Sequence, residues 1–484
     1  MKNQRLLELS PRAGTTLPTQ VRHSIRRSVL SGQLRAGARL PSSRALAAEL
    51  GVSRNTVVEA YEQLLSEGYL EGRHGSGTFV AANLSVDGTR RSSAGSSPRL
   101  LPLSSRGRTS AALATSHSAD TLRPFSPGIP ALSPSALASW FQTAARVRRK
   151  VTPALLNYGD AAGYRPLREV IAGYLGPRRG VTCGADQVVI TSGTQQALSV
   201  AAHLLLDPGE RAWVEEPGYP GAAAALAGAG ARLVHVAVDG DGLAAAAGIR
   251  AAPDARLVYV SPSHQYPLGV TMTLARRLEL LRWADHANAW VLEDDYDSEF
   301  RYDGRTLPAL QGLDDRGRVV YFGTFSKTLF PSLRIGYAVV PAAMAHAFAK
   351  SVEITGHGPS LIDQAALHQF IESGCYSRHL KQVRAVYDER HAVFCQAMGT
   401  RLGGILRVSG EAMGLHVIAE LLSAQDDVRL SHRAAAANLS LPPLSKYYGG
   451  SNPRRGFVMG YGHLSTAQIR AGVGLLTGIL RATR

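Results

Sequence analysis

The chain has 484 residues, of which 45% are hydrophobic and 19% charged, so it is long enough for two or three folded domains and is not globally disordered. Its 53 Lys and Arg residues exceed the 37 Asp and Glu residues and leave a formal net charge of +16, which predicts attraction to polyanions. The three cysteines lack C-x-x-C spacing and indicate neither a disulfide framework nor a zinc site, and because we find no membrane span and no signal peptide, we expect a cytoplasmic protein without membrane contact.

The N-terminal part of the chain has the pattern of three short helices followed by a β-hairpin. The second helix is predicted to start after Ser42 or Ser43 and to end at Gly51, and the third starts after Ser53. The stretch YLEGRHGSGTFVA then places two short apolar segments around a basic, glycine-rich tip, as in a hairpin. Apolar residues at helical spacing are expected inside, namely Val21, Ile25, Val29, Leu30, Leu46, Ala47, Leu50, Val57, Tyr61, Leu64 and Leu65.

A helix, a glycine turn and a second helix beginning Ser-Arg-Asn-Thr predict a helix-turn-helix, whose second helix meets base edges in the major groove. Arg54, Asn55 and Thr56 would contact bases, since Arg pairs well with guanine and Asn with adenine. Arg44 would hold a phosphate, and the hairpin tip at Gly75 would lie along an adjacent groove. The alternative is a three-helix packing unit with a solvated basic face, but the hairpin that follows the helices favours DNA binding.

The segment LPSSRALAAELGVSRNTVVEAYEQLLSEGYLEGRHGSGTFV resembles the winged helix-turn-helix of the GntR family of bacterial transcription regulators. The resemblance implies that Arg44, Arg54 and the wing tip at Gly75 contact operator DNA. We therefore assign residues 1–82 to a DNA-binding domain. Serine, glycine, proline and arginine dominate residues 83–122, which predicts a flexible linker.

Residues 123–484 are predicted to form an α/β domain with a mostly parallel sheet. Short apolar runs such as QVVIT, RLVYVSP and AWVLEDD alternate with helical stretches, which is the pattern of repeated βα units. We expect a large lobe up to about Val340 and a smaller C-terminal lobe.

The strongest chemical signal is the segment GTFSKTLFPSLRIGY, which follows the apolar run RVVYF. Lys327 offers an amine that can form a Schiff base, and Thr324, Ser326 and Arg334 offer hydroxyls and a guanidinium for a phosphate. A phosphorylated aldehyde cofactor needs this combination. A single Ser-Lys pair is more often an exposed loop, so the interpretation depends on the segments upstream.

Two upstream segments follow predicted strands, at the end where ligands bind in α/β sheets. Ser192, Gly193 and Thr194 open a helix, whose N-terminal amides form an anion site. Asp294 and Tyr296 follow the run AWVLE, where a carboxylate can keep a pyridine nitrogen protonated and a phenol can bond a ring hydroxyl. The alternatives here are an acidic loop or a metal site, but no histidine-rich ligand set accompanies these acids.

Two more segments add aromatic and polar groups. Tyr219 in EEPGYPG can stack on a flat ring, and SPSHQYPLG adds His264 and Gln265. In the order TSGT, EEPGY, SPSHQYPLG, EDDY and SKTLFPSLR, these segments resemble the fold-type I aminotransferases that use pyridoxal 5′-phosphate (PLP).

The resemblance to these aminotransferases implies a role for each matching residue. Lys327 would form the internal aldimine, Asp294 would pair with the pyridine nitrogen, Tyr296 would approach the ring hydroxyl, and Tyr219 would stack on the ring. It assigns the phosphate to Ser192, Gly193, Thr194, Thr324, Ser326 and Arg334.

The chain departs from the aminotransferase pattern in two places. His264-Gln265-Tyr266-Pro267 stands where the family has Asn-Pro, which leaves the partner of the ring hydroxyl open. The arginine that binds a substrate carboxylate matches Arg455 best, with Arg454 as the alternative.

The order of winged helix, linker and aminotransferase-like domain resembles the MocR/GabR subfamily of GntR regulators along nearly the whole chain. The resemblance implies a homodimer that regulates transcription by sensing PLP or a small amino-compound effector through Lys327. The segment NYGDAAGYRPLREV, similar to the aminotransferase region near the subunit boundary, also favours a dimer. The alternative function is an active aminotransferase with an appended DNA-binding domain.

Overall fold

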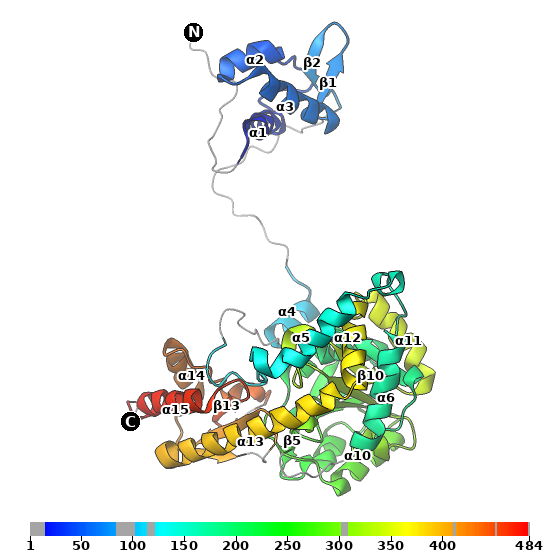
Figure 1. Cartoon of the computed structure of the whole chain (residues 1–484), viewed down its shortest axis with the longest axis vertical. Helices are drawn as coiled ribbons and strands as arrows, with labels where there is room; N and C mark the ends of the chain where they lie inside the picture. Colours follow the sequence, from blue (N-terminus) through cyan, green and yellow to red (C-terminus); the bar gives the residue numbers. More distant parts are fainter. Residues whose placement is uncertain are drawn as a thin grey trace. The chain divides into compact units, whose positions relative to one another are not determined.

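The structure is a computed structural model that describes residues 15–83, 102–113, 122–301, 308–409, 413–450 and 453–482. These residues form two compact units that divide between Pro102 and Leu103 (Figure 1). None of the helices in the described ranges combines the length and apolarity that crossing a membrane requires.

The first unit consists of three helices and an antiparallel hairpin, as the sequence predicts. Ser42 caps the second helix by accepting a hydrogen bond from the Ala45 amide, and Ser53 caps the third through the Thr56 amide. Gly51 lies between them with a φ of 67°, the left-handed conformation that ends helices. The elements are α1 (Leu17–Leu30), α2 (Ser43–Leu50), α3 (Arg54–Ser66), β1 (Leu70–Arg73) and β2 (Gly77–Val80).

The core of the first unit contains most of the apolar residues expected inside. Val21 and Ile25 of α1 pack with Val57 of α3 and with residues from α2 and both strands. Leu30 and Leu65 were expected inside but are 52% and 37% exposed. Each comes directly after a buried residue. Consecutive residues are rotated by about 100° around a helix, so the side chains of Leu30 and Leu65 point away from the buried face.

The second unit is built on an eight-stranded mixed sheet with the order β3-β10-β9-β8-β7-β4-β5-β6. Its strands are β3 (Val188–Thr191), β4 (Arg211–Glu216), β5 (Arg232–Asp239), β6 (Gly242–Leu243), β7 (Leu257–Val260), β8 (Trp290–Asp295), β9 (Val319–Thr324) and β10 (Gly336–Val339). β10 is antiparallel to both β3 and β9, β6 is antiparallel to β5, and the other pairs are parallel. The predicted mostly parallel sheet is therefore confirmed.

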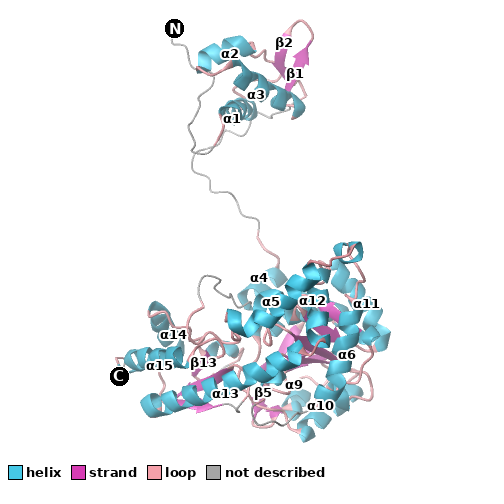
Figure 2. Cartoon of the chain, viewed as in Figure 1, coloured by secondary structure: helices cyan, strands magenta, loops and turns pink. Residues whose placement is uncertain are grey.

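Helices cover both faces of this sheet, which Figure 2 shows in magenta among cyan helices. One face packs against α7 (Thr194–Leu205), α8 (Pro220–Ala229) and α11 (Ala342–Ile354), and the other against α5 (Pro134–Arg148), α6 (Arg165–Arg179), α9 (Ala245–Ala251), α10 (Leu274–His286) and α12 (Leu361–Glu372). Along β7, Leu257 and Tyr259 face one layer and Val258 and Val260 the other. Burial on both faces explains the continuous apolar runs in the sequence.

A smaller lobe follows, with an antiparallel sheet in the order β11-β12-β13. Its elements are α13 (Cys375–Leu402), β11 (Leu406–Ser409), β12 (His416–Leu421), α14 (Asp427–Ala436), β13 (Gly456–Gly460) and α15 (Thr466–Arg481). The expected boundary near Val340 is too early, because Phe348 and Phe370 still belong to cores of the large lobe. The small-lobe core takes in Phe394 and also Phe125, which precedes the large lobe in sequence.

One helix lies within the segment 83–122 that was expected to be a flexible linker. α4 (Ser105–Leu113) packs on α8, and the Ser110 hydroxyl donates a hydrogen bond to the Ala224 carbonyl at 3.1 Å. The contact is close because α8 consists almost entirely of alanine and glycine; a Cβ on Gly228 would come within 3.3 Å of the Ser110 hydroxyl. The second unit therefore begins near Leu103, and residues 84–101 and 114–121 of the expected linker lie outside the described residues.

Candidate functional site

The segments predicted to bind a cofactor meet at one edge of the large sheet. Because β10 runs between β3 and β9, Thr191 and Thr324 both pair with Gly336, one on each side. The turns that follow β3 and β9 therefore leave the sheet next to each other. In the second turn the Ser326 amide donates to the Thr324 hydroxyl at 3.2 Å, and Lys327 comes one residue later.

The side chain of Lys327 points into the protein. Its Nζ donates a hydrogen bond to the Gly128 carbonyl at 2.9 Å, and a Cβ on Gly128 would lie only 2.7 Å from that nitrogen. Burial lowers the pKa of Lys327, while the nearby carboxylates of Asp297 and Asp294 oppose the shift. A lowered pKa increases the fraction of neutral amine, which is the form that attacks a carbonyl.

Asp294 presents an unsatisfied carboxylate oxygen to the same site. Its Oδ2 accepts a hydrogen bond from the Tyr259 hydroxyl at 2.8 Å, whereas its buried Oδ1 has no partner. Burial raises the pKa of Asp294 to about 7. A buried carboxylate oxygen without a donor is costly, so this position suits a ligand that brings an N–H group. Within the described ranges no three acidic, histidine or cysteine side chains are arranged to hold a metal ion.

A buried histidine and carboxylate accompany Tyr296. The Nδ1 atom of His264 lies 2.9 and 3.0 Å from the two carboxylate oxygens of Asp297 and 3.2 Å from the Tyr296 hydroxyl. Gly414 permits this packing, because its φ is 73° and a Cβ there would be 2.4 Å from the His264 ring. Sequence reasoning noted His264 but missed Asp297, although the acidic run from Glu293 onward was visible.

The predicted phosphate ligands also meet. Gly193 precedes α7 with a φ of 105°, and a Cβ on it would lie 3.8 Å from the guanidinium carbon of Arg334. The buried hydroxyl of Thr194, at the first position of α7, has no hydrogen-bond partner. The Ser192 amide is already used, since it donates to the Gln196 side chain at 2.7 Å. A helix N-terminus, an unsatisfied hydroxyl and a guanidinium are the groups that a phosphate needs.

Tyr219 lies immediately before α8 and is half-buried. Its hydroxyl donates to the Gln195 side chain at 3.3 Å, and its ring centroid is 6.5 Å from that of Tyr259, which holds Asp294. Burial raises the pKa of Tyr219 to about 12, so the phenol stays neutral at physiological pH. This ring is in position to lie beside a planar ligand that contacts Asp294.

Arg455 and Arg454 are exposed just before β13 and are not part of this cluster. Arg455 donates a hydrogen bond to the Ala424 carbonyl at 2.6 Å, and Arg454 forms an ion pair with Glu420.

The strand register separates these arginines from the Lys327 site. The start of β13, Gly456, pairs with Glu420 at one end of β12, whereas His416 pairs with Gly460 at the other end. The His416 ring lies 5.3 Å from the His264 ring, so the His416 end of β12 is the end near the Lys327 site. Glu420, at the end near the two arginines, is about 13 Å further along β12 at 3.3 Å per residue.

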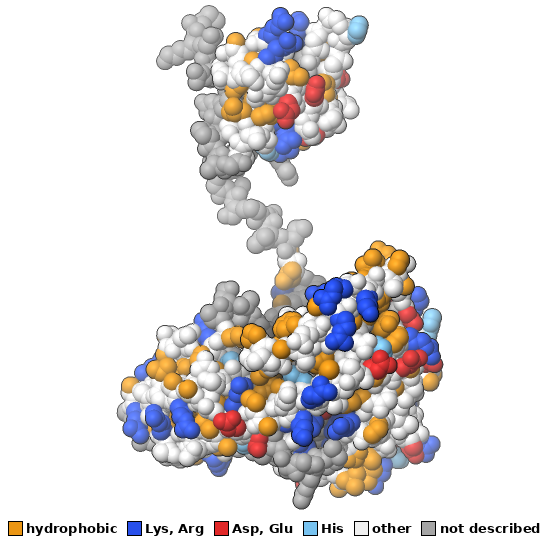
Figure 3. All heavy atoms as spheres, in the orientation of Figure 1, with side chains coloured by type: hydrophobic (Ala, Val, Ile, Leu, Met, Phe, Trp, Pro, Cys, Tyr) orange, Lys and Arg blue, Asp and Glu red, His pale blue; other side chains and the backbone are white. Residues whose placement is uncertain are grey.

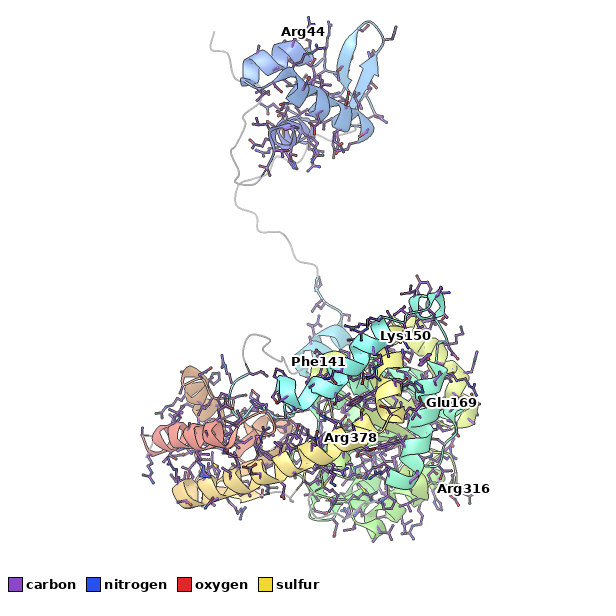
Figure 4. The ribbon with its side chains drawn as sticks, viewed as in Figure 1. Arg44, Phe141, Lys150, Glu169, Arg316 and Arg378 are labelled. Carbon is purple, nitrogen blue, oxygen red and sulfur yellow. The ribbon has the colours of Figure 1, made fainter. Side chains whose placement is uncertain are left out.

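The predicted DNA-contacting residues lie on the surface of the first unit. Arg54 and Asn55 are exposed at the start of α3, and Arg44, labelled in Figure 4, is exposed at the start of α2. Neither arginine forms an ion pair within the described part of the chain. Thr56 is only partly exposed, and its hydroxyl lies 2.8 Å from that of Ser53.

The hairpin carries further basic groups beside its tip. Gly75, at the tip, has a φ of 71° and is exposed. The Arg73 guanidinium lies 4.7 Å from the centroid of the Phe79 ring. The sequence analysis missed Arg39, whose side chain lies 3.3 Å from where a Cβ on Gly77 would be. An isolated bridge between Arg39 and Phe79 explains this placement, which is a contact between distant segments.

The residues at the Lys327 site fit PLP. A half-buried amine, a carboxylate oxygen without a donor and phosphate-binding groups at a helix N-terminus match the aldehyde, the ring nitrogen and the phosphate of that cofactor. The residues that would hold it are Ser192, Gly193, Thr194, Tyr219, Asp294, Tyr296, Thr324, Ser326, Lys327 and Arg334.

Two family models match the chain. Residues 17–80 match the bacterial regulatory proteins of the gntR family, and residues 130–426 match aminotransferase class I and II. The probable rhizopine catabolism regulatory protein MocR of Rhizobium meliloti is 41% identical over 97% of this chain and 95% of its own length. The pyridoxine biosynthesis transcriptional regulator PdxR of Corynebacterium glutamicum is 34% identical over 94% of each chain.

The second unit also resembles solved aminotransferases. The α-aminoadipate aminotransferase LysN of Thermus thermophilus, crystallised with N-(5′-phosphopyridoxyl)-L-leucine, superposes with a TM-score of 0.68 at 27% identity and covers 74% of this chain and 92% of its own. An archaeal alanine:glyoxylate aminotransferase has a TM-score of 0.71 at 23% identity and covers 79% of this chain and 97% of its own.

Proposed function

The chain belongs to the MocR type of GntR-family transcription regulators, and from this membership we propose that its second unit senses PLP, or a small amino compound that reacts with PLP, through Lys327. A regulator of this type binds DNA through the first unit and has PLP as the cofactor of the aminotransferase-like domain. The observation that supports the proposal best is that the half-buried Lys327 amine and the unsatisfied Asp294 carboxylate lie close enough to interact electrostatically.

We assign a task to each residue at this site. The chemistry that bound PLP would supply is an aldehyde that condenses with amines and a ring that withdraws electrons when its nitrogen is protonated. Lys327 would present the amine, and Asp294 would keep the ring nitrogen protonated. Arg334 and the start of α7 would hold the phosphate, Tyr219 would lie beside the ring, and Tyr296 would orient the ring hydroxyl.

The test of sensing is the affinity for operator DNA with and without PLP and candidate amino acids. A ligand shifts DNA binding only if it binds two conformations with different affinity, and a difference of about 1 to 3 kcal/mol changes operator affinity about 5- to 150-fold. We expect a shift of that size in full-length protein. Operator affinity that is the same with and without PLP and every amine tested would contradict the proposal.

The same residues would also support an active aminotransferase, because the amine, the carboxylate and the phosphate site are all in place. Steady-state formation of a keto acid from an amino donor distinguishes the two functions. Turnover at an enzyme-like rate without any effect on operator binding would favour the enzyme.

Arg54 and Arg44 are expected to differ in what they contribute to DNA binding. Arg54→Ala should cost about 1 to 3 kcal/mol on the cognate operator and relax base preference, because Arg54 starts the helix that meets base edges. Arg44→Ala should weaken binding to all sequences alike and reduce its salt dependence. Competition binding with operators mutated one base pair at a time measures both effects. Equal loss of base preference in the two variants would contradict these roles.

We also propose that the protein is a homodimer, which the exposed apolar residues before α6 support. Leu156 and Tyr158 are 71% and 80% exposed, and Ile354 at the end of α11 is 83% exposed. Tyr158 stacks on His357, three residues after Ile354, which places these side chains on one face of the large lobe.

Charges on this apolar face should dissociate the dimer. Leu156→Asp combined with Ile354→Asp removes two apolar contacts and introduces like charges, so we expect a monomer in light scattering after size exclusion. Leu422→Asp combined with Leu475→Asp, at two exposed apolar residues of the small lobe, is the matched control and should leave the mass unchanged. A wild-type protein that is itself monomeric at micromolar concentration would refute the dimer.

A further inference from the structure

The net positive charge is concentrated in the C-terminal lobe. Residues 123–374 contain 23 Lys and Arg and 23 Asp and Glu, so this segment is neutral overall. Residues 375–484 contain 14 Lys and Arg but only six Asp and Glu and have a net charge of +8. This last part is less than a quarter of the chain and carries half of the total excess. The DNA-binding region up to residue 90 has a net charge of only +5.

Three arginines of this lobe form a row along α15, which has no acidic residue. Arg470 and Arg481 are eleven positions apart, about three helical turns, so they lie on one face and are separated by about 16 Å. Arg401, at the end of α13, lies between them, since a Cβ on Gly474 would be 3.1 Å from its guanidinium. We call Arg401, Arg470 and Arg481 the arginine row.

The arginine row is open to solvent. All three side chains belong to exposed residues, and none forms an ion pair within the described ranges. Figure 3 shows Lys and Arg side chains in blue, side by side over the end of the small lobe where Figure 1 draws α15 in red. Exposed guanidinium groups without carboxylate partners bind phosphates well, because their planar donors match phosphate oxygens.

We propose that the arginine row binds the phosphate backbone of DNA that flanks the operator. The inference rests on DNA binding by the first unit, which keeps the second unit close to the same DNA. The 18 residues from 84 to 101 can span at most about 60 Å, or about 18 base pairs at 3.4 Å each. Within that reach the flanking phosphates are present at high local concentration and are the nearest polyanion.

The test compares a short duplex that contains only the operator with a duplex extended by about 20 base pairs on each side. Each phosphate contact contributes about 0.9 to the slope of log affinity against log salt, so the three contacts of each bound row make the wild-type slope steeper by about 2.7 on the extended duplex. Replacing the row with Arg401→Gln, Arg470→Gln and Arg481→Gln should remove that difference and leave binding to the short duplex unchanged.

The matched control replaces three exposed arginines of the neutral part, Arg232→Gln, Arg250→Gln and Arg282→Gln, which lowers the net charge by the same amount. The control should keep the steeper slope on the extended duplex. Equal slopes for row variant and control, or no difference between the duplexes in wild type, would overturn the proposal. Failure of wild type to bind even the short duplex would instead contradict DNA binding by the first unit. Thermal unfolding of all proteins verifies that the variants are folded.

Discussion

Lys327→Ala is expected to abolish both covalent attachment of PLP and the response of operator binding to PLP or amines. The amine at this position is half-buried and hydrogen-bonded to Gly128, its pKa is lowered by burial, and alanine offers no nucleophile. Wild-type protein mixed with PLP should show the visible absorption of a cofactor bonded to a protein amine, and borohydride should fix that bond. The variant should show neither.

The control for this substitution is Lys381→Ala, which removes an exposed lysine of α13. It should retain the absorption and the response. Both variants should bind operator DNA like wild type when PLP is absent, because the first unit is a separate compact unit. A Lys327→Ala protein that keeps its response to PLP would show that sensing does not require the lysine.

Asp294→Asn is expected to stabilise the cofactor-free protein at high pH and to weaken PLP binding. Burial raises the pKa of Asp294 from its ordinary 3.8 to about 7, so the folded state binds the proton more tightly than the unfolded chain does. The protonated Asp294 side chain therefore contributes its full stabilisation to the folded state below about pH 4, and this contribution is lost as the pH rises toward 7. At about 1.4 kcal/mol per pKa unit, the ionised carboxylate costs about 4 kcal/mol above pH 7.

An asparagine side chain still accepts the Tyr259 hydrogen bond but carries no charge. We expect the unfolding temperature of cofactor-free Asp294→Asn at pH 8 to rise by at least about 5 °C, with a smaller effect at pH 4. Loss of a buried charge partner costs about 2 to 5 kcal/mol, so PLP affinity should fall at least about 30-fold. Calorimetry of the two proteins at both pH values and PLP titration measure these effects.

Glu293→Gln is the control on the same strand. Burial raises the pKa of Glu293 to about 7 as well, but its oxygens already accept hydrogen bonds from the Leu310 and Gln311 amides. A glutamine would turn an NH2 group toward one of those amides and lose one of the two hydrogen bonds. PLP affinity should change little, because neighbouring strand residues face opposite sides of the sheet. Similar PLP affinities for the Asp294 and Glu293 variants would contradict the role of Asp294.

Features that depend on neighbouring residues were predicted well. The caps at Ser42 and Ser53 and the left-handed Gly51 follow from hydrogen bonds and backbone freedom within three or four positions. The winged helix, the α/β class and the family were also predicted, because periodicity and ordered motifs are properties of the chain itself. The assigned roles of individual site residues remain predictions that the substitutions above test.

Contacts between distant segments were predicted poorly. Arg455 looked like a ligand from its motif, but strand register places it at the far end of β13 from His416. The pairing of His264 with Asp297 depends on the close approach of Gly414, which lies more than 100 residues further along the chain. The arginine row was not predicted from the sequence, because Arg401 belongs to α13 whereas Arg470 and Arg481 belong to α15.

The sequence by itself therefore determined which parts this protein has, namely a DNA-binding domain and an α/β domain with a lysine after a strand. It also determined the family to which the chain belongs. These depend on local spacing, which any stretch of chain carries with it. Only the tertiary structure decided which parts meet. β10 runs antiparallel between β3 and β9 and so brings the turns after Thr191 and Thr324 together at Gly336. That arrangement results from how the whole sheet is ordered and packed, and no local pattern in the chain encodes it.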